Sequence, residues 1–534
     1  MGREKIMKIT AAAWVLLLSS PAALGCGAEP FAPPCADGGT CDADPSAEPS
    51  EEACLESLAA RRVLDRCGVF VTALWGDDGN PGTKEEPVKT LAHAIAIAPR
   101  ARGRVIVCNE NYFEAITLPS GIDLLGGYDC FGTRPWWKHS KERKYYHMAI
   151  LLPPSDNAIP ITVVAAQDDG EGTTDGVSTI VDMHVLQERR LGQGLDSIAL
   201  RLEPGAVVEV LRSVIEADRG GSGENGQDAV YVDPQPAYGE IGAIGRDACS
   251  AATVAGASAV TTVCGDMVST GGKGGDGAPD RGGDAEDGEP LPASTPGEAG
   301  LGGAGAKDGA PCRDGRRGGD GAPGAPGAAG QGGRLTEAGW VGVPGRQGGT
   351  GAPGQGGGGG GGAPGGRSAC GNAALGGASG GSGGGGGCGG TGGRGGAAGG
   401  ASIGIFAHSG SKLTLRETRV VTAEGGYGGK GGEGRMGGQG AQGGPPGESP
   451  TLGEHACRGG YGGWGGTGGY GGGGSGGPSI GIVYADDEQL TLDRVTFEIG
   501  PAGQGGIADV FDETRDKANR GSDGFSAEMM RFEP

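Results

Sequence analysis

Asp182 and His184 are the two side chains of this sequence best placed for acid–base chemistry. They alternate within VSTIVDMHV, residues 177–185, whose period-two apolar residues predict a strand, so both would project from one face. A carboxylate beside an imidazole can hold a cation or move a proton, and Arg189 and Arg190 follow closely. The matching positions of the other expected strands add no cluster. The histidines show no ligand spacing and no nucleophile motif occurs, so we expect no catalytic residue, no metal and no cofactor.

A row of aromatic residues is the second candidate site. In GGYGGWGGTGGYGGGGSGG, residues 459–477, glycine stands at every third position. A helix with three residues per turn would place Tyr461, Trp464 and Tyr470 along one edge, with about 9 Å between successive turns, and Tyr427 on a partner segment. This ligand ridge could stack on sugar rings. Alternatively, the edge packs against the flank of a folded body and anchors the glycine-rich part.

Calcium is the third kind of ligand that the sequence suggests. The stretch GGKGGD, residues 271–276, matches the start of a calcium-binding nonapeptide, but such repeats act in tandem and one copy is present. Acidic loops such as Asp77 with Asp78 are explained more simply as turns.

Glycine with a period of three sets the architecture of the second half of the chain. Each of five tracts has seven glycines at this spacing, which fits neither an α-helix nor a strand but a polyproline-II-type helix roughly 56 Å long. The tracts are 315–333, 342–360, 377–395, 425–443 and 459–477.

A strand pattern repeats three times around these tracts. Ser197-Ile198 recurs as Ser402-Ile403 and Ser479-Ile480, and apolar residues follow each serine at the same offsets of eleven and eighteen. Three strands at identical offsets indicate three coils of one β-solenoid. We expect Ile198, Ile403 and Ile480 to stack inside it.

The glycine tracts then form excursions between neighbouring coils, which require an even number of segments. Tracts 425–443 and 459–477 supply one pair, and we expect the broken run 271–309 to supply the fourth segment of the earlier insert. Hydrogen bonds between closely spaced backbones would order such a bundle. These tracts resemble the glycine-rich bundles of some antifreeze proteins and phage adhesin tips. A flexible linker and a collagen triple helix are the alternatives.

The N-terminus predicts export. Basic residues precede the apolar run 9–18, and Ala23-Leu24-Gly25-Cys26 resembles the cleavage site of a bacterial lipoprotein, which implies acylation of Cys26. An ordinary secretory signal is the alternative. The acidic, Pro-rich residues that follow predict a tether. A net charge of −22 argues against nucleic acid as a partner.

Twelve cysteines remain after Cys26, which suggests disulfides in an exported chain. The sequence does not fix their connectivity. Local pairing would join Cys54 to Cys67, Cys108 to Cys130 and Cys249 to Cys264.

A strand, a Gly/Asn/Pro loop and a short Ala-rich helix follow the tether. This stretch resembles the opening cap of pectin-lyase-like right-handed parallel β-helices, and the match is carried by Gly76, Asp78, Gly82, Thr83, Pro87, Thr90, Leu91 and Ala94. The resemblance implies an all-β fold, a right-handed parallel β-helix with inserted glycine-rich polyproline/polyglycine-II-type bundles. That family includes polysaccharide lyases as well as proteins without activity.

The expected parts of the chain are a signal peptide (1–25), a tether (26–60), a cap with the first coils (61–218), a glycine-rich insert (219–401), a coil (402–423), a glycine-rich hairpin insert (424–478) and the last coil with its cap (479–534). We expect a non-catalytic, lipid-anchored protein of the bacterial cell envelope, in the outer membrane or at the cell surface. Its role would be structural, adhesive or glycan-binding, with polysaccharide or other surface components as partners. The alternatives are a secreted β-helix carbohydrate-active enzyme, such as a polysaccharide lyase, and an ice- or glycan-binding module.

Overall fold

The computed structural model describes residues 48–60, 62–130, 138–139, 148–154, 158–166, 176–188, 193–232, 235–290, 298–450, 455–508 and 519–533. Pro49–Pro534 form one compact unit and Met1–Glu48 another. The proposed acylation site Cys26, as well as Cys35, Cys41, Arg189 and Arg190, lie outside the described residues.

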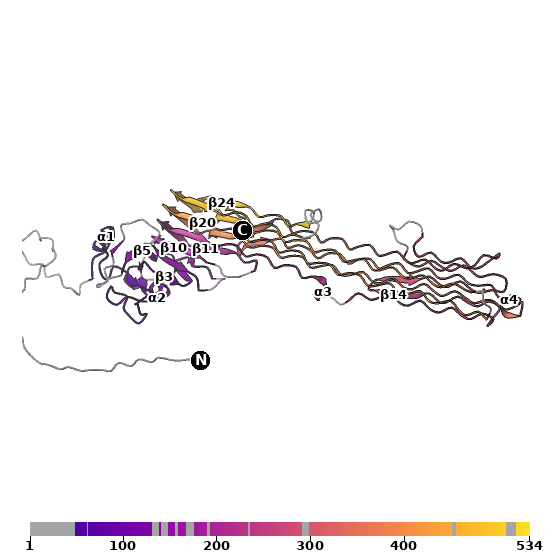
Figure 1. The fold of residues 1–534 in the computed structure, drawn as a ribbon. Coiled ribbons are helices and arrows are strands. Elements are labelled where there is room, and N and C mark those ends of the chain that lie inside the picture. Colours follow the sequence, from indigo (N-terminus) through magenta and orange to yellow (C-terminus); the bar gives the residue numbers. More distant parts are fainter. Residues whose placement is uncertain are drawn as a thin grey trace, which may run out of the picture. The chain divides into compact units, whose positions relative to one another are not determined.

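Long parallel sheets make up most of the regular structure, and we call these three sheets the three-sheet body (Figure 1). The first has the order β1 (Val69–Val71), β2 (Arg104–Cys108), β5 (Asp123–Asp129), β9 (Ser178–Val181), β12 (Val207–Leu211), β19 (Lys412–Arg416) and β22 (Leu490–Asp493), with β6 (Lys138–His139) antiparallel to β5. The second has the order β3 (Asn111–Phe113), β7 (Ala149–Leu152), β10 (Met183–Gln187), β13 (Val214–Ala217), β20 (Arg419–Thr422) and β23 (Thr496–Ile499). The third has the order β4 (Ile116–Pro119), β8 (Ile161–Val164), β11 (Ser197–Leu202), β18 (Ser402–Ala407), β21 (Ser479–Tyr484) and β24 (Ser526–Arg531).

From β9 onward the chain visits the first, second and third sheets in turn, so each circuit stacks on the previous one. The expected register of the repeat is confirmed, because Ile198 pairs with Ile403 and Ile403 with Ile480. These isoleucines were wrongly placed in the main core. They belong to a second apolar cluster with Phe406, whereas Leu200, Ile405 and Ile482 of the same strands join the main core.

One corner of the stack is held by a column of alternating charges. The residue between the first-sheet and second-sheet strands has a positive φ in successive circuits: Asp182 (51°), Arg212 (49°), Glu417 (48°) and Arg494 (54°). Asp182 pairs with Arg212 at 2.9 Å and Glu417 with Arg494 at 3.0 Å. The bond to Asp182 raises the pKa of Arg212. Ion pairing along the column therefore offsets part of the cost of the left-handed backbone.

Helices close the beginning of the stack. Leu91, Ala94 and Ile95 of α2 (Leu91–Ile97) are buried in the main core, and the 3₁₀ turn η1 (Ala98–Ala101) continues from it. The Asp78 carboxylate, in the loop that resembles a β-helix cap, accepts the Thr90 amide and hydroxyl at 2.9 Å just before α2.

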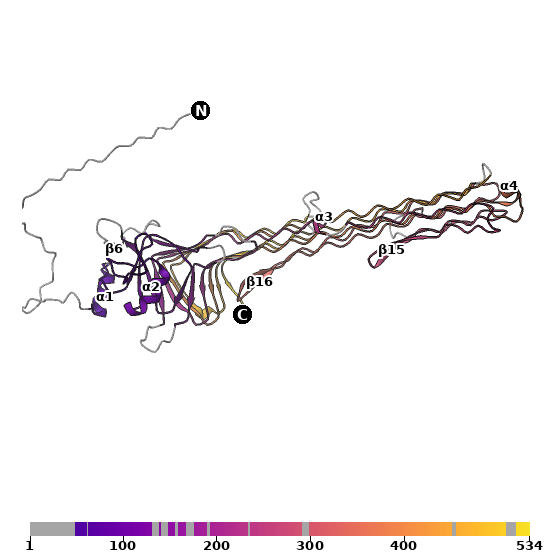
Figure 2. The same ribbon diagram turned by 90° about the horizontal axis from the view of Figure 1, so that it is seen from below.

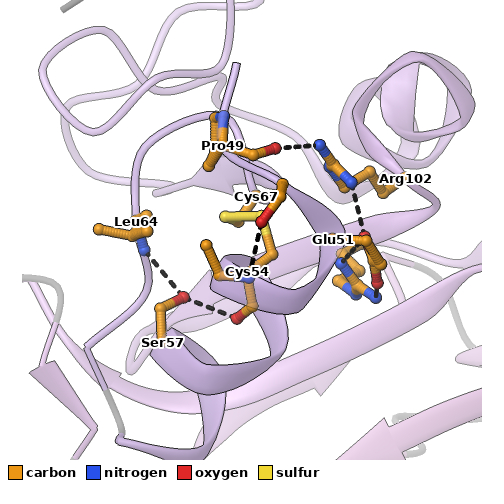
Figure 3. The surroundings of a disulfide bond; sticks show 10 residues. Pro49, Glu51, Cys54, Ser57, Leu64, Cys67 and Arg102 are labelled. Carbon is orange, nitrogen blue, oxygen red and sulfur yellow. Dashed lines mark hydrogen bonds and ion pairs between the residues drawn. A yellow bond between two sulfur atoms is a disulfide. The ribbon is translucent and has the colours of Figure 1, made fainter. Parts of the chain in front are cut away.

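Helix α1 (Glu51–Ala59) attaches the end of the tether to this region (Figure 3). The expected Cys54–Cys67 disulfide fixes the helix, and the Ser57 hydroxyl donates to the Cys54 carbonyl at 2.7 Å. Glu51 forms ion pairs with Arg104 and with Arg102, the latter at 2.7 Å.

The Glu51→Gln variant tests this attachment. The Arg104 hydrogen bond, with help from Arg102, holds the pKa of Glu51 below its ordinary value. The resulting stability is present above the ordinary glutamate pKa and is lost as pH falls through the lowered one. Because Glu51 is half exposed, we expect the variant to lose less than about 1 kcal/mol at neutral pH in urea denaturation. A deficit that persists in strong acid would contradict this origin.

Glycine-rich segments leave the three-sheet body side by side and form what we call the glycine bundle (Figures 1 and 2). Its segments are 219–248, 254–258, 271–289, 298–330, 343–363, 376–400, 424–447, 455–477, 500–507 and 519–524. Short helices and hairpins punctuate them: α3 (Ala229–Val232), α4 (Gly366–Cys370), β14 (Val260–Cys264) with β15 (Met267–Gly271), and β16 (Gly333–Thr336) with β17 (Gly339–Gly342).

The fourth long segment of the first insert is 219–248, not the run 271–309 that was expected. Residues 220–229 and 239–248 follow 424–448, with bonds from Gly223 to Tyr427 (2.7 Å) and from Gly242 to Gln442 (2.9 Å). Residues 271–290 and 298–309 instead form shorter antiparallel pieces. The sequence does carry a sign of this segment: glycine recurs at every third position both before and after α3, and this pattern was missed.

Consecutive glycines mark the places where a segment is surrounded on all sides. Gly359, Gly360 and Gly361 donate to three different segments, at 2.9–3.0 Å from the carbonyls of Glu286, Gly381 and Arg313. A Cβ added at the same three positions would come closer than 3.0 Å to the carbonyl oxygens of Lys273, Cys457 and Ala304. Lys273 and Ala304 lie on the antiparallel stretches that bond to Glu286 and Arg313 within the same two segments. Six stretches of backbone thus contact this run, and only glycine lets them approach so closely.

Three disulfides cross-link the bundle: Cys249–Cys370, Cys264–Cys388 and Cys312–Cys457. The Cys108–Cys130 pair was expected correctly. The Cys249–Cys264 pair was wrong, because the chain between them runs along the bundle and each cysteine meets a different part of segment 366–388.

The hairpin β16–β17 secures the bundle to the three-sheet body. Leu335 and Trp340 pack against the second apolar cluster, and the Trp340 ring lies edge-on to Phe525 at 5.8 Å. The Asp196 carboxylate accepts amides from Trp340 and Ala401 at 2.7 Å, so one side chain joins the hairpin to the strand that re-enters the body.

Candidate ligand-binding groove

The three positions of each triplet in segment 455–477 have different neighbours. The first glycine donates to segment 424–447, as Gly465 does to Gly438 (2.9 Å), and the second to segment 343–363, as Gly463 does to Gln355 (2.8 Å). The carbonyl of the third residue accepts from segment 298–330, as that of Trp464 does from Gly321 (2.7 Å). These bonds fix the direction in which the third side chain leaves the segment.

The residue type at this third position follows the packing. At Gly473 and Gly476 an added Cβ would collide with the carbonyls of Gly506 and Gly503, because the short segment 500–507 lies alongside. The earlier third positions lie beyond the end of segment 500–507, whose last bond joins Gly431 to Ile507, and they hold Tyr461, Trp464, Thr467 and Tyr470. Tyr461 is 46% exposed and Trp464 43%. Large side chains therefore occupy the positions that segment 500–507 does not cover.

The row of amides that contacts segment 500–507 continues into the same open space. Gly425, Gly428 and Gly431 donate to Pro501, Gln504 and Ile507 at 2.8–3.0 Å. Gly434 and Gly437 are next in this row, and no backbone carbonyl of the described residues accepts from them.

A break in segment 219–248 opens the other wall. The bonds of Ala229 to Glu433 (2.9 Å) and Gly239 to Gln439 (2.8 Å) flank the break at α3. The resulting hollow has a volume of about 440 Å³, and we call it the aromatic groove. Its walls include Asp228, Tyr238, Glu433, Arg435, Met436 and Trp464. Tyr238 and Met436 are exposed there and were not anticipated, because the sequence gives no sign that segment 219–248 breaks opposite Trp464.

Of the four residues of the expected ridge, Trp464 lines this groove, whereas Tyr427, Tyr461 and Tyr470 are not among its walls. Gly477 bonds to Gly426 and Gly465 to Gly438, so Tyr427 lies about twelve residues, roughly 37 Å, along the bundle from the level of Trp464. Its hydroxyl donates to Glu424 at 2.7 Å, which raises the pKa of Tyr427.

Asp182 and His184 do not form an acid–base pair. Asp182 is the corner residue between β9 and β10, so the expected single strand is two strands, and the Asp182 carboxylate pairs with Arg212. His184 lies on β10 with its Nε2 at 2.8 Å from Glu216, and this contact lowers the pKa of Glu216. Asp182 and His184 therefore have different partners, Arg212 and Glu216.

Aspartates of the bundle cap backbone amides. Asp276, in the stretch that matches a calcium-binding repeat, accepts the Gly256 amide at 2.7 Å, and Asp320 accepts the Trp464 amide at 2.8 Å. Asp228, Asp284, Asp287 and Asp314 cap amides in the same way. Within the described ranges one group of three ligand types lies close enough for one ion, Cys108, Glu110 and Cys130, and its two cysteines are joined as a disulfide.

No known protein family, curated protein or solved structure matches this chain. In the described residues, none of the helices has the length and apolar character needed to cross a bilayer.

Proposed function

We propose that this chain is an exported, lipid-anchored, non-catalytic protein of the bacterial cell envelope that binds glycans through the aromatic groove. In this proposal the three-sheet body is a right-handed parallel β-helix, similar to the pectin-lyase-like family, and the glycine bundle is of the polyglycine-II type. The stacked parallel strands and the three-residue hydrogen-bond period support these assignments. The signal-like N-terminus with Cys26 supports the anchor.

One observation carries the binding proposal. Within a single segment, the third residue is glycine where segment 500–507 covers it, whereas beyond that segment it is a larger residue, and one of these, Trp464, is 43% exposed and lines the groove. Aromatic faces pack against the C–H faces of sugar rings. The nearby amides of Gly434 and Gly437 and the side chains of Glu433 and Arg435 offer donors and acceptors for hydroxyl groups. An apolar wall with few polar groups is typical of ligand sites.

The non-catalytic part of the proposal rests on the state of the polar side chains. Asp182 pairs with Arg212, His184 lies within hydrogen-bond distance of Glu216, and the bundle aspartates cap amides. The groove itself presents carboxylates, a guanidinium group, a thioether and aromatic rings.

Trp464→Ala is the variant that tests the proposal. On a glycan array, we expect the wild-type protein to retain at least one polysaccharide and this variant to bind it tenfold more weakly or worse, a loss of about 1.4 kcal/mol. Trp464→Phe keeps a ring and should retain most of the binding. Tyr427→Ala, which removes an aromatic ring outside the groove, is the matched control. Unchanged binding by Trp464→Ala, or polysaccharide cleavage by the wild-type protein, would refute the proposal.

A further inference from the structure

The last circuit of the three-sheet body leaves its core open. Strands β22, β23 and β24 are the terminal strands of the three sheets, and no strand of the described residues pairs with their outer edges. Side chains that are covered one circuit earlier are exposed here: Leu415 is 0% exposed but its neighbour Leu492 is 37%, and Ile482 is 0% but Met529 is 43%. Unpaired strand edges with exposed apolar side chains favour pairing with another chain.

We propose that a second copy of this chain docks on the open edges of β22, β23 and β24. The opposite end of the stack is covered by α2, so the open end of one copy cannot join the beginning of another to form a fibre. Two open ends can meet, which gives a closed twofold dimer. The local charge permits it: the three strands and their corner carry three acidic and two basic residues, in a chain of net charge −22.

If all three sheets continue across the interface, the twofold axis passes through the middle of β24. On the other side of the stack it passes through the corner between β22 and β23, between Arg494 and Val495. It places β22 of one copy antiparallel to β23 of the other. Leu492 then lies opposite Phe497, and Leu490 opposite Ile499. Leu490 and Phe497 pack on the core, and Leu492 continues the column of Leu415, so the apolar interior would run on across the dimer. The two Arg494 side chains that meet near the axis are each paired with Glu417 and Asp493.

The outward-facing residues of the same pairing supply a test. Thr491 and Glu498 are exposed and lie opposite each other across the proposed interface, at a separation that a disulfide can span. Purified Thr491→Cys and Glu498→Cys proteins should each remain largely uncrosslinked alone and form a covalent dimer when mixed and oxidised. Equal crosslinking in every sample, or none in the mixture, would overturn this arrangement.

The oligomeric state provides the second readout. In sedimentation equilibrium we expect the wild-type protein to be a dimer and Leu492→Lys to be at least tenfold weaker in self-association. Leu301→Lys makes the same substitution at a leucine of the bundle that is also 37% exposed, and it should leave the dimer intact. A monomeric wild-type protein would overturn the proposal, whether or not the aromatic groove binds glycans.

Discussion

Gly359→Ala should destabilise the glycine bundle by about 3 kcal/mol, which would be one of the largest effects of adding a single carbon atom to this protein. The new Cβ would collide with the carbonyl group of Lys273 and would also meet the Cβ of Ala285 at 3.0 Å, which is fixed to the backbone. Backbone cannot rotate away as a flexible side chain would. Alanine would restrict the unfolded chain and so recover about 0.4–1 kcal/mol, too little to offset the overlap.

Thr350→Ala is the control for this prediction, because it creates the same residue in the same segment. Thr350 is an exposed third-position residue, so a Cβ is already accommodated there, and we expect a change within about 0.5 kcal/mol. Chemical denaturation of both variants makes the comparison. Similar stabilities would mean that segment 343–363 is not surrounded as described.

Removal of the Cys264–Cys388 disulfide by a double serine substitution should cost about 5 kcal/mol, against about 3 kcal/mol for Cys54–Cys67. The first pair closes a sequence separation of 124 residues and the second one of 13, so the first restricts the unfolded chain more. If lost packing dominated instead, the Cys54–Cys67 variant would lose more stability, because Cys54 and Cys67 are fully buried.

Denaturation midpoints and slopes of the two double variants, without reductant, decide between these causes. A greater loss for the Cys54–Cys67 variant would show that local packing, rather than chain entropy, dominates the contribution of the disulfides.

Much of the fold could be predicted, because the spacing of apolar residues and of glycines along the sequence reflects which backbone segments lie next to each other. The offsets that link Ile198, Ile403 and Ile480 require strands in register, and the pairing follows. The main-core assignment failed because the third-sheet strands are covered on both sides, here by the hairpin with Trp340, and burial on both faces removes the alternation that separates inside from outside.

The groove could be predicted only in part. Of the aromatic residues at every third position after Gly459, Trp464 is among the walls of the groove, so the sequence identified one of its residues. Tyr238 and Met436 come from segments whose axial alignment is set by hydrogen bonds far along the bundle. Tyr427 was misassigned for the same reason. The spacing of side chains shows which edge of a segment they occupy, but it does not show how far that segment is shifted along the bundle relative to the next one.

Aspartate at the bundle surface has a role that composition alone does not suggest. Where a segment lacks a neighbour, an amide would lose its acceptor, and a carboxylate from the adjacent segment supplies one, as Asp320 does for Trp464 and Asp228 for Glu433. Part of the acidic character of the chain therefore serves the edges of the bundle.

Hydrogen exchange at the amides of residues 356–362 tests the central claim most directly, namely that backbone hydrogen bonds between segments hold the glycine half together. These amides donate to three surrounding segments, so the account predicts that they exchange only through global unfolding, as slowly as the amides of β11 and β18 in the core. Exchange at the rate of an unstructured glycine peptide, while β11 and β18 stay protected, would contradict it.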